Sequence, residues 1–179
     1  MFGSKNIKYF LLGVVFVAFC SFTTSNRLLK KVHKEIEKTF QIKEAVLNPI
    51  ELKSSELNQQ LRVHQSDQFF KIEKDNQLLG YAYLGKAPSK TDEFDYLILI
   101  DKDLIIKKTK VLIYREDYGG EIGSKRWLKQ FTGKTVNDKL KYSKDIMAIS
   151  GATISANSMT IAVNTFLKNI QILKEKKTL

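Results

Sequence analysis

The sequence is 179 residues long, and its 30 Lys and Arg against 19 Asp and Glu give a formal net charge of +11. A hydrophobic fraction of 43% is ordinary for a globular protein and too high for a disordered one. This length suits one domain with short extensions and excludes a two-domain enzyme of the dehydrogenase kind. One cysteine and two histidines, outside any ligand spacing, disfavour a Cys or His metal site and a Ser–His–Asp triad.

The positive charge comes almost entirely from lysine, because the arginines are only Arg27, Arg62, Arg115 and Arg126. Recognition of bases and phosphates favours the planar guanidinium, whereas lysine suits a solvated surface. The lysines are also scattered rather than gathered in a tract. We therefore expect no nucleic-acid partner, and instead a solvated face or attraction to a membrane surface or an acidic partner.

Residues 1–25 have the layout of an export signal. Lys5 and Lys8 precede an apolar run over 9–20, and a polar stretch follows. The run is short for a helix that spans a bilayer, which needs about twenty residues. We expect a signal peptide or an uncleaved N-terminal membrane anchor. Lipoprotein processing at Cys20 is disfavoured because Phe19 stands where a small residue is needed. The protein is expected to be extracytoplasmic, in the periplasm or on the outer face of the cytoplasmic membrane.

After the leader, residues 26–68 are expected to form an N-terminal helix and a connecting segment. Apolar residues recur at helical spacing from Arg27 to Leu47, and Asn48-Pro49 is expected to close this helix. Residues 51–68 are polar and predict a loop with a helical turn.

Residues 69–179 carry the pattern of an α+β domain. Two pairs of strand-like runs are separated by short polar turns, and they cover 69–73 with 78–84 and 94–100 with 104–114. Such short connections predict an antiparallel meander of about four strands. Ser124 is placed to cap a short helix that Gly133 ends, and an amphipathic helix is expected over 155–174.

The last helix is opened by Ser150-Gly151-Ala152-Thr153, with Ser155 two residues later. Gly151 permits a sharp turn, and the hydroxyl groups lie where unpaired N–H groups and the helix dipole attract an anion. This pattern predicts either a phosphate site or an ordinary side-chain cap of the helix N-terminus.

A second unusual segment lies between the predicted sheet and the short helix. It consists of Tyr118, Gly119, Gly120, Glu121 and Ile122, followed by another glycine. Its glycines allow the backbone to lie flat against a planar ligand, and nearby Tyr114, Tyr118 and Trp127 could supply stacking surface. The alternative is a tight strand-to-helix connection beside a core tryptophan.

Together these two segments resemble the FMN-binding domain of exported electron-transfer proteins. Similar domains are the flavin subunits of sodium-translocating NADH:quinone reductase and the flavin domain of nitrous oxide respiration regulators. The likeness extends from about Phe69 onward and includes the stretches 114–122 and 130–134. Because of this resemblance, Thr153 is expected to carry FMN as a phosphoester that a separate flavin transferase forms from FAD. Ser150, Gly151 and Ala152 would shape the turn, Ser155 would lie near the phosphate, and residues 118–122 would border the flavin ring.

One position departs from the family pattern. The family usually has an acidic residue three before the serine of the motif, and this chain has Met147, with Asp145 two residues earlier. The departure bears on covalent attachment more than on flavin binding. The expected function is an electron-transfer relay between a membrane redox partner and an envelope acceptor, rather than a self-contained enzyme. The alternative is a basic envelope protein that keeps the fold without flavin and binds anionic lipid or an acidic partner.

Overall fold

The computed structural model describes residues 27–50 and 67–179. The predicted leader at 1–25 and most of the predicted connecting segment lie outside the described residues. By internal contacts the chain divides into two units, Met1–Glu35 and Ile36–Leu179, and the second unit contains the sheet. Among the residues described, no helix combines the length and the apolar character that crossing a bilayer requires.

The first predicted helix is shorter than its apolar spacing indicated. Residues 27–40 are helical, and the side chains of Val32 and Ile36 are buried as the pattern predicted. Gln41 and Glu44 then adopt left-handed backbone conformations with φ of 56° and 61°, which end the helix. The prediction that the helix continues to Leu47 was therefore wrong, and the stretch Val46–Pro49 is a strand, β1.

The sheet has five antiparallel strands in the order in which they occur along the chain. The strands are β1 (Val46–Pro49), β2 (Gln68–Lys74), β3 (Gln77–Pro88), β4 (Glu93–Asp101) and β5 (Ile106–Ile113). β1 adds one edge strand to the predicted meander of about four, and the α+β class is confirmed. A proline is tolerated in β1 because the strand pairs on one side only, with β2. The β2–β3 hairpin turns through Asp75 and Asn76, both at positive φ, as tight hairpins require.

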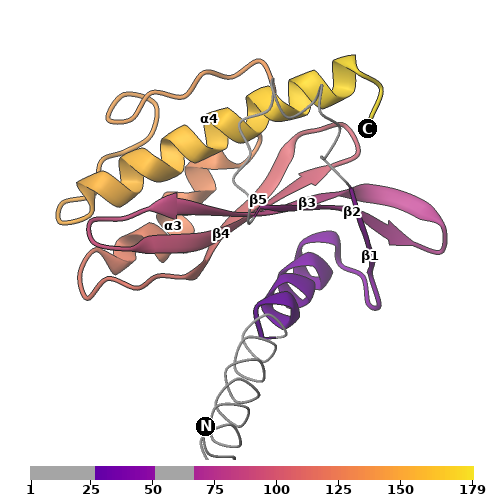
Figure 1. Ribbon diagram of the computed structural model, residues 1–179, viewed down its shortest axis with the longest axis horizontal. Helices are drawn as coiled ribbons and strands as arrows, with labels where there is room; N and C mark the ends of the chain where they lie inside the picture. The colour runs from indigo at the N-terminus through magenta and orange to yellow at the C-terminus, as the bar shows by residue number, and fades with distance from the viewer. Residues whose placement is uncertain (1–26, 51–66) are drawn as a thin grey trace, which may run out of the picture. The chain divides into compact units, whose positions relative to one another are not determined.

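The hydrophobic core lies between the sheet and the C-terminal helix α4 (Thr153–Glu175), which runs along one face of the sheet in Figure 1. Alternate residues of β4, from Phe94 to Ile100, share this core with Met159, Val163 and Phe166 of α4. Leu97 and Leu99 point to the opposite face and are also fully buried. A central strand buried on both faces gives the domain a rigid frame for the loops at its ends.

Between β5 and α4 the chain makes three short helical turns, which are η1 (Gly120–Gly123), α3 (Lys125–Leu128) and η2 (Lys129–Phe131). The predicted cap is confirmed, because the Ser124 side chain accepts a hydrogen bond from the Trp127 N–H at 3.2 Å. Gly133 pairs with Ile106 through its backbone N–H at 2.8 Å. The Asn164 side chain accepts a hydrogen bond from the Leu140 N–H and donates one to the Leu140 carbonyl. These two bonds attach the loop around Leu140 to α4.

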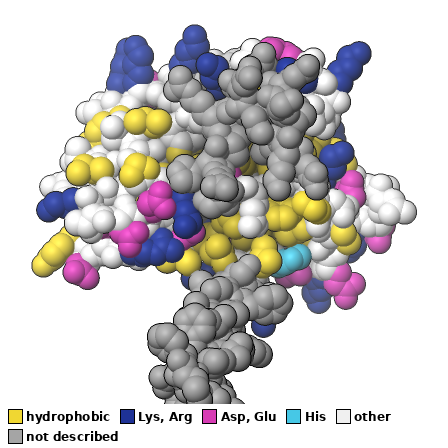
Figure 2. Space-filling model, in the orientation of Figure 1, with side chains coloured by type: hydrophobic (Ala, Val, Ile, Leu, Met, Phe, Trp, Pro, Cys, Tyr) yellow, Lys and Arg dark blue, Asp and Glu magenta, His cyan; other side chains and the backbone are white. Residues whose placement is uncertain are grey.

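The charges are distributed over the surface. On the face shown in Figure 2, Lys and Arg side chains lie along the upper edge and at several separate places, where Asp and Glu side chains are among them. Such a distribution fits a generally solvated basic surface better than one continuous basic tract.

Candidate functional site

The two segments singled out from the sequence touch each other in the fold. Gly119 has φ of 79°, a backbone conformation that residues with a side chain rarely adopt. A Cβ atom at this position would lie 2.7 Å from the Ala152 Cβ and 3.0 Å from the Gly151 carbonyl oxygen. Only glycine lets the loop after β5 approach the start of α4 this closely.

α4 begins at Thr153, and no side chain caps it. The N-cap residue is Ala152, which makes no side-chain hydrogen bond to the helix. Of the two alternatives that the sequence left open for this terminus, the side-chain cap is therefore not observed. An α-helix leaves its first four N–H groups without intrahelical partners, and its dipole places partial positive charge there. The start of α4 thus has the electrostatics of an anion site.

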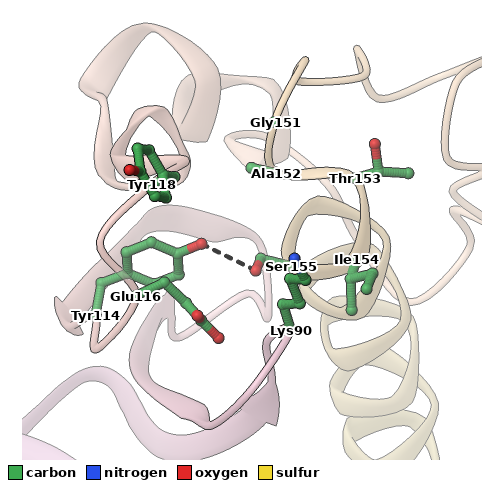
Figure 3. Close-up of a pocket in the computed structure, with 9 residues that line it drawn as sticks. All are labelled: Lys90, Tyr114, Glu116, Tyr118, Gly151, Ala152, Thr153, Ile154 and Ser155. Atoms are coloured by element: carbon green, nitrogen blue, oxygen red, sulfur yellow. Dashed lines mark hydrogen bonds between the residues drawn. The ribbon is translucent and has the colours of Figure 1, made fainter.

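Ser155 is used differently from its neighbours in the motif. Its side chain is 2% exposed, and its Oγ shares a hydrogen bond of 3.0 Å with the Tyr114 hydroxyl. Tyr114 directly follows β5, so this bond fastens the first turn of α4 to the end of the sheet. The dashed line in Figure 3 marks this contact.

A cavity of about 290 Å³ opens where these elements meet. Its lining comes from the β3–β4 turn, the loop after β5 and the start of α4, and consists of Lys90, Tyr114, Glu116, Tyr118, Gly151, Ala152, Thr153, Ile154 and Ser155. The volume is near the lower end of the range for ligand pockets, about 300–1,000 Å³. Thr153 is exposed, and in Figure 3 its hydroxyl points outward from the first turn of the helix. Its oxygen is therefore open to reaction.

Apolar side chains at the cavity are unusually exposed. Tyr118 is 82% exposed and Ile154 is 51% exposed, although both line the cavity. Figure 3 shows them on opposite sides of it, Tyr118 on the loop after β5 and Ile154 on α4. Apolar surface left open in a concavity marks a place where a ligand with apolar faces is bound.

Two of the residues that line the cavity have charged side chains, the cationic Lys90 and the anionic Glu116. Lys90 lies in the turn between β3 and β4, and Glu116 lies in the loop after β5. Glu116 accepts hydrogen bonds from the Thr91 N–H at 2.7 Å and the Thr91 hydroxyl at 2.8 Å. Hydrogen bonds from Ser89 and Thr91 lower the pKa of Glu116 to about 2, so it is ionised at neutral pH.

The loop that leads into the motif is held from the opposite side by α3 and η2. The indole N–H of Trp127 donates to the Met147 carbonyl at 2.7 Å, and the Met147 N–H donates to Gln130 Oε1 at 2.8 Å. Trp127 is buried and packs edge-on against Phe131. Trp127 is therefore a core residue that supports the loop, and it is not among the residues that line the cavity.

The fold brings together half of the residues predicted for the site. Tyr118, Gly151, Ala152, Thr153 and Ser155 line the cavity. The others are not among its lining residues, and these are Ser150, Gly119, Gly120, Glu121 and Ile122. Ile122 is fully buried in the core. The sequence reading missed Lys90 and Ile154. Lys90 lies far from both motifs along the chain, and it reaches the cavity because the β3–β4 hairpin turns there.

Comparison with known families agrees with this geometry. The FMN-binding domain family matches residues 90–168, a range that includes every residue lining the cavity. No curated protein matches the chain. Residues 90–168 of this chain thus match the FMN-binding domain family, and the match supports FMN as the cofactor. Among the residues that the structure describes, no group of three or more His, Cys, Asp or Glu is arranged to hold a metal ion.

Proposed function

We propose that this protein is an extracytoplasmic electron-transfer flavoprotein whose FMN is joined through its phosphate to Thr153. It would relay electrons between a membrane reductase and an acceptor in the cell envelope. The observation that carries the proposal is the position of Thr153, an exposed hydroxyl at the uncapped start of α4 and at the edge of a cavity with apolar walls. The match of residues 90–168 to the FMN-binding domain family supports FMN as the ligand of that cavity.

Attachment requires one transfer reaction, for which we propose a flavin transferase as partner and FAD as donor. The Oγ1 of Thr153 forms a bond to the phosphorus on the FMN side of FAD, and the phosphoanhydride bond breaks. AMP leaves with the bridging oxygen, and the hydroxyl proton is released. The phosphodiester keeps one negative charge, which the free N–H groups at the start of α4 would stabilise.

The rest of the cavity fits a planar, partly apolar ligand. Tyr118 and Ile154 present exposed faces that an isoalloxazine ring would cover. The Tyr114–Ser155 hydrogen bond and the close contact of Gly119 with Ala152 fix the two walls relative to each other. Bound FMN supplies the redox chemistry, while the protein holds it in place and sets its electrostatic surroundings.

The proposed location and partners are supported by features of the sequence. The basic, apolar leader supports export, and a covalent tether would retain a cofactor that cannot be resupplied outside the cytoplasm. The excess of lysine supports long-range attraction to an anionic membrane surface or an acidic redox partner. One flavin without a nicotinamide site fits a relay that receives electrons from one protein and passes them to another.

The test is co-expression of the full chain with a flavin transferase in a compartment that supplies FAD and Mg²⁺. A denaturing gel under ultraviolet light is expected to show a fluorescent band, and the intact mass is expected to rise by one FMN less one water. Thr153→Val is expected to abolish both signals. Thr132→Val, at an exposed threonine outside the cavity, is the matched control and is expected to keep them.

A dark band for the wild-type chain in the presence of active transferase contradicts covalent attachment. Titration of that protein with FMN then decides whether flavin binds reversibly. No binding at all would favour the alternative of a basic envelope protein that uses its charge to bind anionic lipid or an acidic partner.

A further inference from the structure

We infer that Lys90 is the electrostatic partner of the reduced flavin ring and that Glu116 is a positioning residue that holds Lys90 at the cavity. This inference rests on the proposed function, because it requires FMN in the cavity between Tyr118 and α4. It assigns the redox tuning of the site to a hairpin turn that neither sequence motif contains.

Lys90 reaches the cavity from the β3–β4 turn. In Figure 3 its side chain extends from that turn toward the first turn of α4, with its amine at the level of Ser155. It is the one lysine or arginine among the residues that line the described cavity. A cation at this place stabilises whatever negative charge the ligand gains.

The ring is a better partner for Lys90 than the phosphate. The phosphodiester on Thr153 would already face the N–H groups at the start of α4, whose dipole suits a single negative charge. In Figure 3 the Thr153 hydroxyl points away from the other lining residues, whereas the exposed side chain of Lys90 extends toward the first turn of α4. Reduction of the ring by two electrons with uptake of one proton leaves it with one negative charge. Lys90 would stabilise that charge and thereby raise the midpoint potential.

Glu116 determines where the turn lies. Its carboxylate accepts from the Thr91 N–H, the Thr91 hydroxyl and the Asp92 N–H, at 2.7, 2.8 and 3.3 Å. Thr91 directly follows Lys90, so these bonds fasten the backbone of the turn to the loop after β5. Hydrogen bonds to a carboxylate are roughly twice as strong as neutral ones. Without them Thr91 and Asp92 are released, and the bond from Arg115 to the Glu93 carbonyl at 2.7 Å still joins the loop to the start of β4.

The two roles of Glu116 predict opposite effects on the flavin, which makes the inference testable. Removing a negative charge near the ring would by itself raise the midpoint potential. Releasing Lys90 from the cavity would lower it. If Glu116 acts by positioning Lys90, then Glu116→Ala lowers the potential in the wild-type background and raises it in the Lys90→Gln background, where no cation remains to be released.

The experiment measures the midpoint potential of the FMN-loaded full chain by spectroelectrochemistry at pH 7. Lys90→Gln is expected to lower the potential, and Lys90→Arg, which keeps the charge, is expected to stay near the wild-type value. Lys168→Gln is the matched control, since Lys168 lies fifteen residues beyond Thr153 on α4, about 22 Å along the helix axis. That separation exceeds the Debye length of about 10 Å at 0.1 M salt.

Equal potentials for Lys90→Gln and Lys168→Gln would overturn the role of Lys90. A Glu116→Ala variant whose potential rises in both backgrounds would overturn the positioning role. Thermal unfolding of each variant shows whether the fold is retained, and the Lys90→Arg result distinguishes charge from packing. A chain that binds no FMN contradicts the proposed function, whereas an FMN-loaded chain insensitive to Lys90 contradicts this inference alone.

Discussion

Gly119 lies so close to Ala152 that a single methyl group added to the glycine would come within 2.7 Å of the alanine Cβ. This contact joins the loop after β5 to the start of α4. The two segments that the sequence marked separately are therefore one structural unit, and the cavity lies at their junction. The close contact of these two segments depends on the absence of a side chain at position 119.

Gly119→Ala is expected to destabilise the fold and to reduce flavin loading. The positive φ and the clash with Ala152 together should cost about 2–4 kcal/mol. Two other glycines separate these effects. Gly133 has φ of 81° with nothing within 4 Å of its added Cβ, so Gly133→Ala should cost only the strain, about 1 kcal/mol. Gly120 has open space and no positive φ, so Gly120→Ala should be nearly neutral.

Urea unfolding of the three variants measures these differences, and flavin fluorescence of the loaded proteins measures occupancy. Gly133→Ala is expected to keep normal loading because it lies outside the cavity. If Gly119→Ala were no less stable than Gly133→Ala, the close contact with Ala152 would not govern this junction.

The hydrogen bond between Tyr114 and Ser155 is expected to contribute measurably to stability. Ser155 is buried, so Tyr114→Phe leaves its hydroxyl without this partner and should cost about 1–3 kcal/mol. Ser155→Ala should cost a similar amount, and the double variant should cost less than the sum. Tyr118→Phe, at a ring that is 82% exposed, is the control and should be nearly neutral for the unfolding free energy. Strict additivity of the two single changes would contradict a direct bond.

Acid stability should report the hydrogen bonds of Glu116. Its pKa is about 2 in the fold against an ordinary value of 4.5 for a free glutamate, so the bonds stabilise the folded state above pH 4.5. That contribution should be lost progressively as the pH falls from 4.5 through 2. Glu116→Gln is expected to flatten the decline of the unfolding midpoint over this range. The pKa of Asp138 is also lowered, by its hydrogen bonds with Thr135, so Asp138→Asn tests whether any carboxylate would give the same result.

Much of this fold could be predicted from local pattern. The alternation of strands β2 to β5, the polar turns between them and the Ser124 cap are encoded within a few residues, and each was confirmed. Strand β1 was missed because its pairing with β2 spans more than twenty residues, and helical spacing from Leu28 to Phe40 invited extension to Leu47. The helix ends at Gln41 and Glu44, which have left-handed backbone conformations although neither is a glycine, so the sequence does not indicate this end.

The site divides in the same way. Thr153 and its neighbours were recognisable because the motif is contiguous and opens a helix. Lys90 was not, because it enters the cavity through a hairpin whose position relative to α4 is a tertiary property. The role of Ser155 also depended on tertiary contact, since its partner Tyr114 lies 41 residues earlier. The segment around Thr153 could therefore be identified from the sequence, whereas the side of the cavity that carries Lys90 could not.

Restoring the acidic residue of the family pattern is expected to improve flavin attachment. Met147 is 71% exposed, and its backbone N–H and carbonyl are already bound by Gln130 and Trp127. Met147→Asp can therefore keep both backbone bonds, and the unfolding free energy should change by no more than about 0.5 kcal/mol. A carboxylate held three residues before Ser150 would face the transferase during the reaction at Thr153.

Gel fluorescence after a fixed time of co-expression with the transferase gives the measurement, normalised to total protein. Met147→Asp is expected to raise the flavinylated fraction several-fold where the wild type is incompletely loaded, and Met147→Asn, which has the same size but no charge, is the control. Asp145→Asn tests the neighbouring carboxylate, whose oxygen already accepts from the Lys141 N–H at 2.8 Å. This bond holds the Asp145 carboxylate within its own loop. Replacing Asp145 by Asn is therefore expected to leave the effect of Met147→Asp unchanged. Equal loading of the Asp and Asn variants would mean that charge at this position does not guide the transferase.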